Sequence, residues 1–212
     1  VFMKRVSLKP LEVSDAGEVY ELCRATFREE YHITEERILE SLFEDPDFSA
    51  EESKKIVDEK NGRMIGFIGV KVSHNEQLYP ASAWISIFAV KKEEQGKGYG
   101  TMVLNQVCQS LHKNGINKIY VGQDFNNFFS GIPDPDEGKE IFFKKNGFTL
   151  NRDRHFDLEA DITDNRLIDS FDTSSFDKEF TVASYKDNKK ELLGFLEREF
   201  PGRWVFEAEE AI

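Results

Sequence analysis

The feature that most constrains this sequence is a run in which every second residue is glycine: Gly96, Gly98 and Gly100. An almost wholly apolar segment, residues 85–90, precedes the run and predicts a strand, while residues 101–113 follow with apolar side chains at helical spacing. Closely spaced glycines let a backbone approach an anion, and free N–H groups at a helix start point toward it. This order predicts a phosphate-binding turn, with a turn that binds nothing as the alternative.

Two common phosphate motifs do not fit the run, since a P-loop ends in Gly-Lys-Ser/Thr and a dinucleotide fingerprint has the spacing G-x-G-x-x-G. The string from Gln95 to Gly100, Gln-Gly-Lys-Gly-Tyr-Gly, instead resembles Gln/Arg-x-x-Gly-x-Gly/Ala, the pyrophosphate loop of the GNAT N-acetyltransferases. The preceding Phe88-Ala-Val-Lys-Lys-Glu-Glu94 resembles the lead into that loop. A second stretch, Glu140-Ile-Phe-Phe-Lys-Lys-Asn-Gly-Phe148, resembles the other cofactor motif of the family.

The resemblance extends over about residues 4–159. It implies an α+β fold, the GNAT acyl-CoA N-acyltransferase fold, in which helices flank a mixed, mostly antiparallel sheet. It also implies acetyl-CoA (CoA) as the cofactor, with no metal ion. The residues that match the cofactor motifs are Phe88, Ala89, Val90, Gln95, Gly96, Lys97, Gly98, Tyr99, Gly100, Thr101 and Phe143.

The family chemistry is direct attack of a primary amine on the thioester. Such a reaction needs a neutral amine, a stabilised oxyanion and a proton for the departing thiolate. The resemblance implies that backbone groups near Phe88 and Val90, at a splayed or bulged strand end, hold the pantetheine arm and polarise the thioester carbonyl. Residues 95–101 would then hold the pyrophosphate.

The acid and the base are where this sequence departs from the family. Phe143 occupies a position that is often Tyr, and Phe cannot donate a proton; water or Tyr120 is the substitute, and a thiol with a pKa of about 8.5 leaves tolerably well. No carboxylate lies within residues 84–90, so a base must come from a loop. The candidates are Asp124 first, then Glu29, Glu30 and His32, each with an ordinary surface charge as the alternative.

The expected acceptor is a small-molecule amine such as an amino sugar, a polyamine or an amino acid derivative. Two alternatives stay open: a non-catalytic acyl-CoA-binding or regulatory protein, and an acetyltransferase that modifies proteins. The position of the irregular loop at residues 124–138 decides between small and large acceptors, because a loop folded over the thioester leaves room only for a small one. The aromatic residues of this loop could shape the acceptor pocket or merely cover the core.

The net charge limits the classes of binding partner, and the cysteine content indicates the cellular compartment. The net charge of -12 argues against nucleic acid and against anionic membranes, and no apolar run is long enough to span a bilayer. Cys23 and Cys108 each lie in a helical pattern, which favours small buried side chains in a reducing compartment over a disulfide. A cytoplasmic location is therefore expected, and a homodimer is compatible with it.

Periodicity and turn residues predict the other elements of a domain at residues 1–160. The expected elements are a strand from residue 6, two helices up to Asp45-Pro46, a hairpin of residues 54–60 and 64–72 around Asn61-Gly62, a buried central strand at 81–90, a strand at 119–123, a short helix at 139–146, and strands at 148–150 and 155–159. After these, residues 161–178 are polar and acidic and predict a linker.

The remaining residues, 179–212, predict one strand up to Tyr185 and one helix that stops at Pro201-Gly202. A strand and a helix cannot bury a core alone. The stretch from Glu191 to Trp204 is similar to the start of the second half in tandem-GNAT bacterial proteins. We therefore expect either an incomplete second GNAT-like domain or a tail packed on the first domain.

Overall fold

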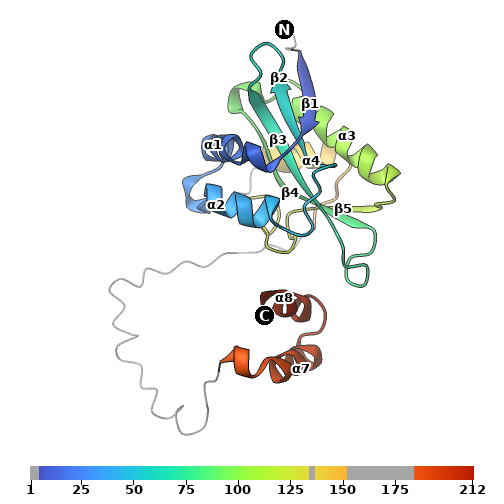
Figure 1. The fold of residues 1–212 in the computed structure, drawn as a ribbon. Coiled ribbons are helices and arrows are strands. Elements are labelled where there is room, and N and C mark those ends of the chain that lie inside the picture. The colour runs from blue at the N-terminus through green and yellow to red at the C-terminus, as the bar shows by residue number, and fades with distance from the viewer. Residues whose placement is uncertain (1–4, 134–136, 152–183) are drawn as a thin grey trace. The chain divides into compact units, whose positions relative to one another are not determined.

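The computed structural model describes residues 5–133, 137–151 and 184–212. The chain divides into two compact units, Val1–Arg152 and Asp153–Ile212 (Figure 1). The predicted linker lies outside the described residues, so the predicted domain boundaries stay a prediction. No helix in the described part of the chain is long and apolar enough to cross a membrane.

The first unit is built on one five-stranded sheet with the order β1-β2-β3-β4-β5. Neighbouring strands from β1 to β4 run antiparallel to each other, whereas β5 runs parallel to β4. The strands are β1 (Val6–Pro10), β2 (Lys54–Asp58), β3 (Met64–Val72), β4 (Ser82–Val90) and β5 (Lys118–Val121). The predicted hairpin is confirmed as β2 and β3.

Helices flank the sheet, as Figure 1 shows, with α1 and α2 on one side and α3 on the other. On the first side, Phe67 and Ile87 of the sheet pack with apolar residues of α1 and α2; on the second, Ile68 and Ile85 pack with α3. The helices are α1 (Ala16–Thr26), α2 (Glu35–Ile38, continued as the π-helical turn η3, Leu39–Phe43), α3 (Tyr99–Lys113) and α4 (Glu137–Lys145), and the 3₁₀ turns are η1 (Val13–Asp15), η2 (Glu29–Tyr31) and η4 (Lys92–Glu94).

The central strands explain this two-layered core. Nearly every residue of β3 and β4 is buried, which confirms that β4 is covered on both faces. A strand that is covered on both faces needs a continuous apolar sequence rather than an alternating one. The predicted α+β architecture, a mixed and mostly antiparallel sheet flanked by helices, is confirmed.

One predicted strand of the first unit is wrong. Residues 148–150 follow α4 without joining a strand. The Phe148 N–H donates to the Phe143 carbonyl (3.1 Å), and Gly147 has a φ of 91°. Phe148 therefore helps to end α4, since a left-handed glycine after the last turn brings the next N–H back onto the helix. The strand predicted at 155–159 lies outside the described residues.

The second unit contains η5 (Tyr185–Asp187), α7 (Lys189–Glu199) and α8 (Arg203–Ala211). Tyr185 was predicted to end a strand, but Ser184 caps a 3₁₀ turn there through its hydroxyl, and residues 179–183 lie outside the described residues. The predicted helix is confirmed as α7. The sequence did not predict α8, which begins directly after Pro201 and Gly202 and packs against α7 through Trp204.

Candidate active site

Strand β4 is irregular where it passes β5. Val70 pairs with Ile85 and Gly69 pairs with Ile87, which leaves Ser86 as an extra residue in a β-bulge. The pairing with β5 stops at the same place, because Ile85 is the last residue of β4 opposite β5. The two parallel strands therefore separate beyond Ile85, and residues 86–90 have no strand partner on that edge among the described residues.

The backbone of this open edge can be assigned by alternation. The Lys91 N–H donates to the carbonyl of Ile65 in β3 (2.9 Å). Because backbone direction alternates along a strand, the N–H and C=O groups of Ala89 also point toward β3. The backbone N–H and C=O groups of Phe88 and Val90 consequently point the other way, toward the edge that β5 leaves open. The Val90 carbonyl already accepts a hydrogen bond from Gln95 Nε2 (2.9 Å). Gln95 thus ties the glycine loop to the end of β4.

The glycine loop leads directly into α3. Gly96 and Gly98 have φ values of 72° and 87°, and a Cβ at either position would meet no atom within 4 Å. Gly98 is the N-cap of α3, with no side-chain cap and no acidic residue in the first turn. Met102 N–H is bonded to the Gly98 carbonyl (3.0 Å). The first N–H groups of an α-helix have no carbonyl partner within the helix, so a helix start without an acidic residue or a side-chain cap is suited to an anion.

Three other predicted residues of the loop have distinct surroundings. The Lys97 ammonium lies 2.9 Å from the buried Glu94 carboxylate, so its charge is held by an ion pair. The Tyr99 ring is buried in the core beside α3, and only its backbone lies at the helix start. Thr101 is exposed in the first turn.

The two cofactor motifs meet around one aromatic ring. The Phe88 ring centroid lies 5.8 Å from that of Phe142 and 6.5 Å from that of Phe143. A Cβ at Gly100 would lie 3.4 Å from the Phe142 ring, so the start of α3 packs closely against α4. Phe143 itself is buried among aromatic rings, including Phe148 at 5.4 Å.

The first candidate base, Asp124, lies in an unexpected place. Its side chain is 1% exposed, and Oδ1 lies 2.5 Å from the buried Lys71 ammonium. That ammonium also contacts Asp45 (2.8 Å) and donates to the Phe125 carbonyl (2.9 Å). Burial raises the pKa of Asp124, while Lys71 and a hydrogen bond with Ser86 act in the opposite direction. The residue connects the loop of residues 122–131 to β3 and to the bulge of β4. This loop is called the acceptor loop after the role predicted for it.

The other catalytic candidates lie on the surface. Tyr120 is 37% exposed, and its ring stacks on Trp84 (6.2 Å, 28°). Glu29 and Glu30 are exposed in η2, where Glu30 pairs with Arg28 at 3.0 Å. His32 follows with a left-handed φ of 45°. The catalytic roles of Tyr120, Glu29, Glu30 and His32 stay predictions.

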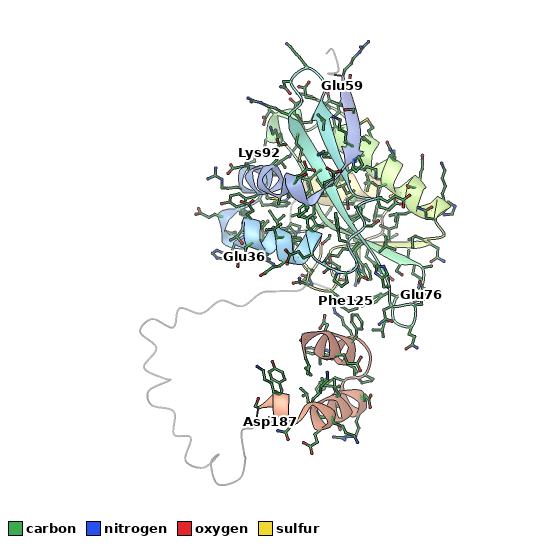
Figure 2. The ribbon with its side chains drawn as sticks, viewed as in Figure 1. Glu36, Glu59, Glu76, Lys92, Phe125 and Asp187 are labelled. Atoms are coloured by element: carbon green, nitrogen blue, oxygen red, sulfur yellow. The ribbon has the colours of Figure 1, made fainter. Side chains whose placement is uncertain are left out.

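The acceptor loop is held against α2 and the connection between α1 and α2. The Arg37 guanidinium donates to the carbonyls of Asn127 (3.3 Å), Phe128 (3.2 Å) and Tyr31 (3.1 Å). The Phe129 ring packs at 5.1 and 5.2 Å on two rings from the connection between α1 and α2: Phe27 and Tyr31. Phe125 lies at the same end of the sheet as Glu76, opposite Glu59 (Figure 2). The loop and the α1–α2 connection therefore form one packed surface.

Two residues of this arrangement were missed at the sequence level. Lys71 had a detectable signal, because a lysine inside an apolar strand is rarely buried without a charged partner. Arg37 had none, since the loop carbonyls to which it donates lie 90 and 91 residues away along the chain. Both cysteines are free, and burial raises the pKa of the Cys23 and Cys108 thiols. Within the described residues, no group of three or more His, Cys, Asp or Glu is placed to hold a metal ion.

Comparison with known proteins adds an independent finding. The model of the acetyltransferase (GNAT) family matches residues 16–130. No curated protein matches the sequence. A ribosomal-protein alanine N-acetyltransferase from Escherichia coli shares the fold with a TM-score of 0.54 and 15% identity, over 68% of this chain and 78% of that chain.

Two further structures are similar. The PaiA N-acetyltransferase from Thermoplasma acidophilum, solved with coenzyme A, has a TM-score of 0.52 and 18% identity over 71% of this chain and 93% of that chain. A glucosamine N-acetyltransferase region of a fungal multi-domain β-N-acetylglucosaminidase has a TM-score of 0.70 and 18% identity. That match covers 99% of this chain and 25% of the fungal chain.

Proposed function

The chain belongs to the acetyltransferase (GNAT) family, enzymes that use acetyl-CoA, and from this premise we propose that it acetylates the primary amine of a small molecule by direct attack. The amine nitrogen forms a bond to the acetyl carbon and the carbon–sulfur bond breaks. One proton leaves the nitrogen, and the thiolate of CoA takes up a proton or departs as the anion. No covalent enzyme intermediate is needed.

The cofactor would be held at the glycine loop and the open edge of β4. The N-terminus of α3 at Gly98 offers backbone N–H groups and the positive end of the helix dipole to the pyrophosphate. Phe88 and Val90 offer backbone groups to the pantetheine arm and the thioester carbonyl. Gln95 would act indirectly by bonding Val90, and Lys97 would contribute its charge from the ion pair with Glu94.

A small acceptor is favoured by one observation, the packing of the loop that contains Phe128 and Phe129. Arg37 bonds to this loop and Phe129 packs on Phe27 and Tyr31, so the loop is held against the α1–α2 connection. A protein acceptor needs a more open approach to the thioester. The base would be Asp124 or Glu29, and Tyr120 or water would protonate the thiolate. A homodimer and a cytoplasmic location are further proposals.

The test is release of free CoA thiol from acetyl-CoA in the presence of single amines. The panel should include glucosamine, a diamine, an amino acid amide and a peptide with a free N-terminal amine. We expect turnover with one of the small amines, lost in Gly98→Trp, which fills the space above the loop. Turnover only with the peptide would replace the proposal by protein acetylation. Tight CoA binding without turnover on any amine would contradict acetyl transfer.

A further inference from the structure

A hollow lies at the C-terminal end of α3, away from the glycine loop at its N-terminus. Its volume is about 380 Å³, which is in the range of small-molecule sites. Its apolar wall consists of Phe48, Val72, Leu111 and Ile116. The other lining residues are polar and include three carboxylates, of which Glu52 is only 2% exposed.

The Glu52 carboxylate is half satisfied. Oε1 accepts hydrogen bonds from Ser110 Oγ (3.0 Å) and from Asn114 Nδ2 (2.7 Å). Oε2 is buried and has no hydrogen-bond partner among the residues that the structure describes. Lys54, the nearest lysine along the chain, donates to the carbonyls of Glu51 and Ser53 instead. A buried anion with an unpaired oxygen is costly, which indicates that a partner is missing.

The surroundings of Glu52 favour a positive partner. Ser110 and Asn114 lie in the last turn and the C-cap of α3, where the helix dipole is negative. Asp47 and Glu51 also line the hollow, and the basic residue that lines it, His74, lies 2.8 Å from Asp47. The helix C-terminus and the three carboxylates therefore all favour a positively charged ligand.

We propose that this hollow binds a small organic cation, an ammonium with an alkyl stem. The charged head would pair with Glu52, and the stem would lie against Phe48, Leu111 and Ile116. An organic cation fits better than a metal ion, because no group of three or more ligating side chains is placed for a metal among the described residues. Since α3 has 15 residues and rises about 1.5 Å per residue, the site lies about 20 Å from the glycine loop.

The experiment is a titration of the full chain, without acetyl-CoA, with 1,4-diaminobutane, followed by NMR of labelled methyl groups. We expect shifts at Val72, Leu111 and Ile116, and none with the neutral 1,4-butanediol. Glu52→Gln should weaken binding by about tenfold or more, because a charge-assisted contact is lost. Its fold should persist, since the Gln carbonyl can still accept from Ser110 and Asn114. Diaminobutane should also raise the Tm of the wild type but not of this variant.

Glu51→Gln is the matched control, because it removes the same charge from an exposed neighbour in the same hollow. Its effect should stay below about threefold, as for a screened surface charge. Equal losses in the two variants would show general attraction to an acidic surface and overturn the site. Binding of butanediol, or an absence of shifts at these methyl groups, would also overturn it.

Discussion

The Nζ of Lys71 lies 2.5 Å from Oδ1 of Asp124, and both side chains are almost completely buried. Lys71 belongs to β3, whereas Asp124 opens the acceptor loop after β5, so one ion pair ties that loop to the centre of the sheet. The pair also reaches Asp45 and the Phe125 carbonyl. The buried ammonium therefore fixes the start of the surface that we assign to the acceptor.

Lys71→Met should destabilise the protein strongly. Removing one partner of a buried ion pair leaves the remaining charges unpaired, here Asp45 and Asp124, which costs about 3–5 kcal/mol. Denaturant unfolding measures this loss. Lys55→Met is the control, because Lys55 pairs with Asp15 in a more exposed pair, 17% and 13% exposed, and should cost much less. Similar losses in the two variants would show that Lys71 is not a special fixing point.

The pH dependence of stability tests the state of Asp124. Burial raises its pKa above the reference value of 3.8. A carboxyl whose pKa is higher in the folded state binds its proton more tightly there, so it contributes stability below about pH 3.8 that is lost as pH rises. The free energy of unfolding of the wild type, minus that of Asp124→Asn, should therefore fall as pH rises above 3.8. A rising difference would mean that Lys71 outweighs burial.

These two residues also mark the limit of prediction from sequence. Local patterns predicted β3, β4 and α3 well, because an apolar run or a helical spacing is a property of neighbouring residues. Lys71 and Asp124 are 53 positions apart, and nothing local says that they meet. The same limit applies to Phe148, which lies in a segment with the composition of a strand but whose N–H bonds to the last turn of α4. At the candidate site, the glycine loop was predictable and the family resemblance implied a splayed or bulged end of β4, whereas the exact position of the bulge at Ser86 and the burial of Asp124 were not predictable.

Gly98→Ala should weaken CoA binding. The substitution places a side chain at a φ of 87°, which costs about 1–2 kcal/mol, and puts a methyl group where the pyrophosphate would approach. Gly115→Ala is a close control, since Gly115 has a φ of 86° and equally open surroundings at the other end of α3. The two variants should lose similar stability, but only Gly98→Ala should raise the Kd for CoA in calorimetry. If the two variants had the same Kd for CoA, the glycine loop would not be part of the cofactor site.

Phe143→Tyr should not raise kcat. The ring is buried among Phe88, Phe142 and Phe148, so a hydroxyl there would lack a partner and cost about 1–3 kcal/mol. The CoA thiolate, with a thiol pKa of about 8.5, also leaves without strong acid assistance near neutral pH. Steady-state kinetics and thermal unfolding of the variant measure both effects. A higher kcat would show that the missing tyrosine limits the reaction.

Gly122→Ala should damage the acceptor side and spare the cofactor side. A Cβ at Gly122 would lie 2.5 Å from the Phe129 carbonyl oxygen and 2.7 Å from the Gly131 nitrogen, and its φ is 65°. Backbone atoms cannot move away as a flexible side chain can, so the acceptor loop must shift and carry Phe129 away from its partners on the α1–α2 connection. We expect a higher KM for the amine and an unchanged Kd for CoA. Gly62→Ala provides the control, because Gly62 has a φ of 71° with open space around it and shares the strain without the clash. An unchanged KM in Gly122→Ala would mean that the amine does not contact this loop, and the acceptor would then have to approach from another side of the sheet.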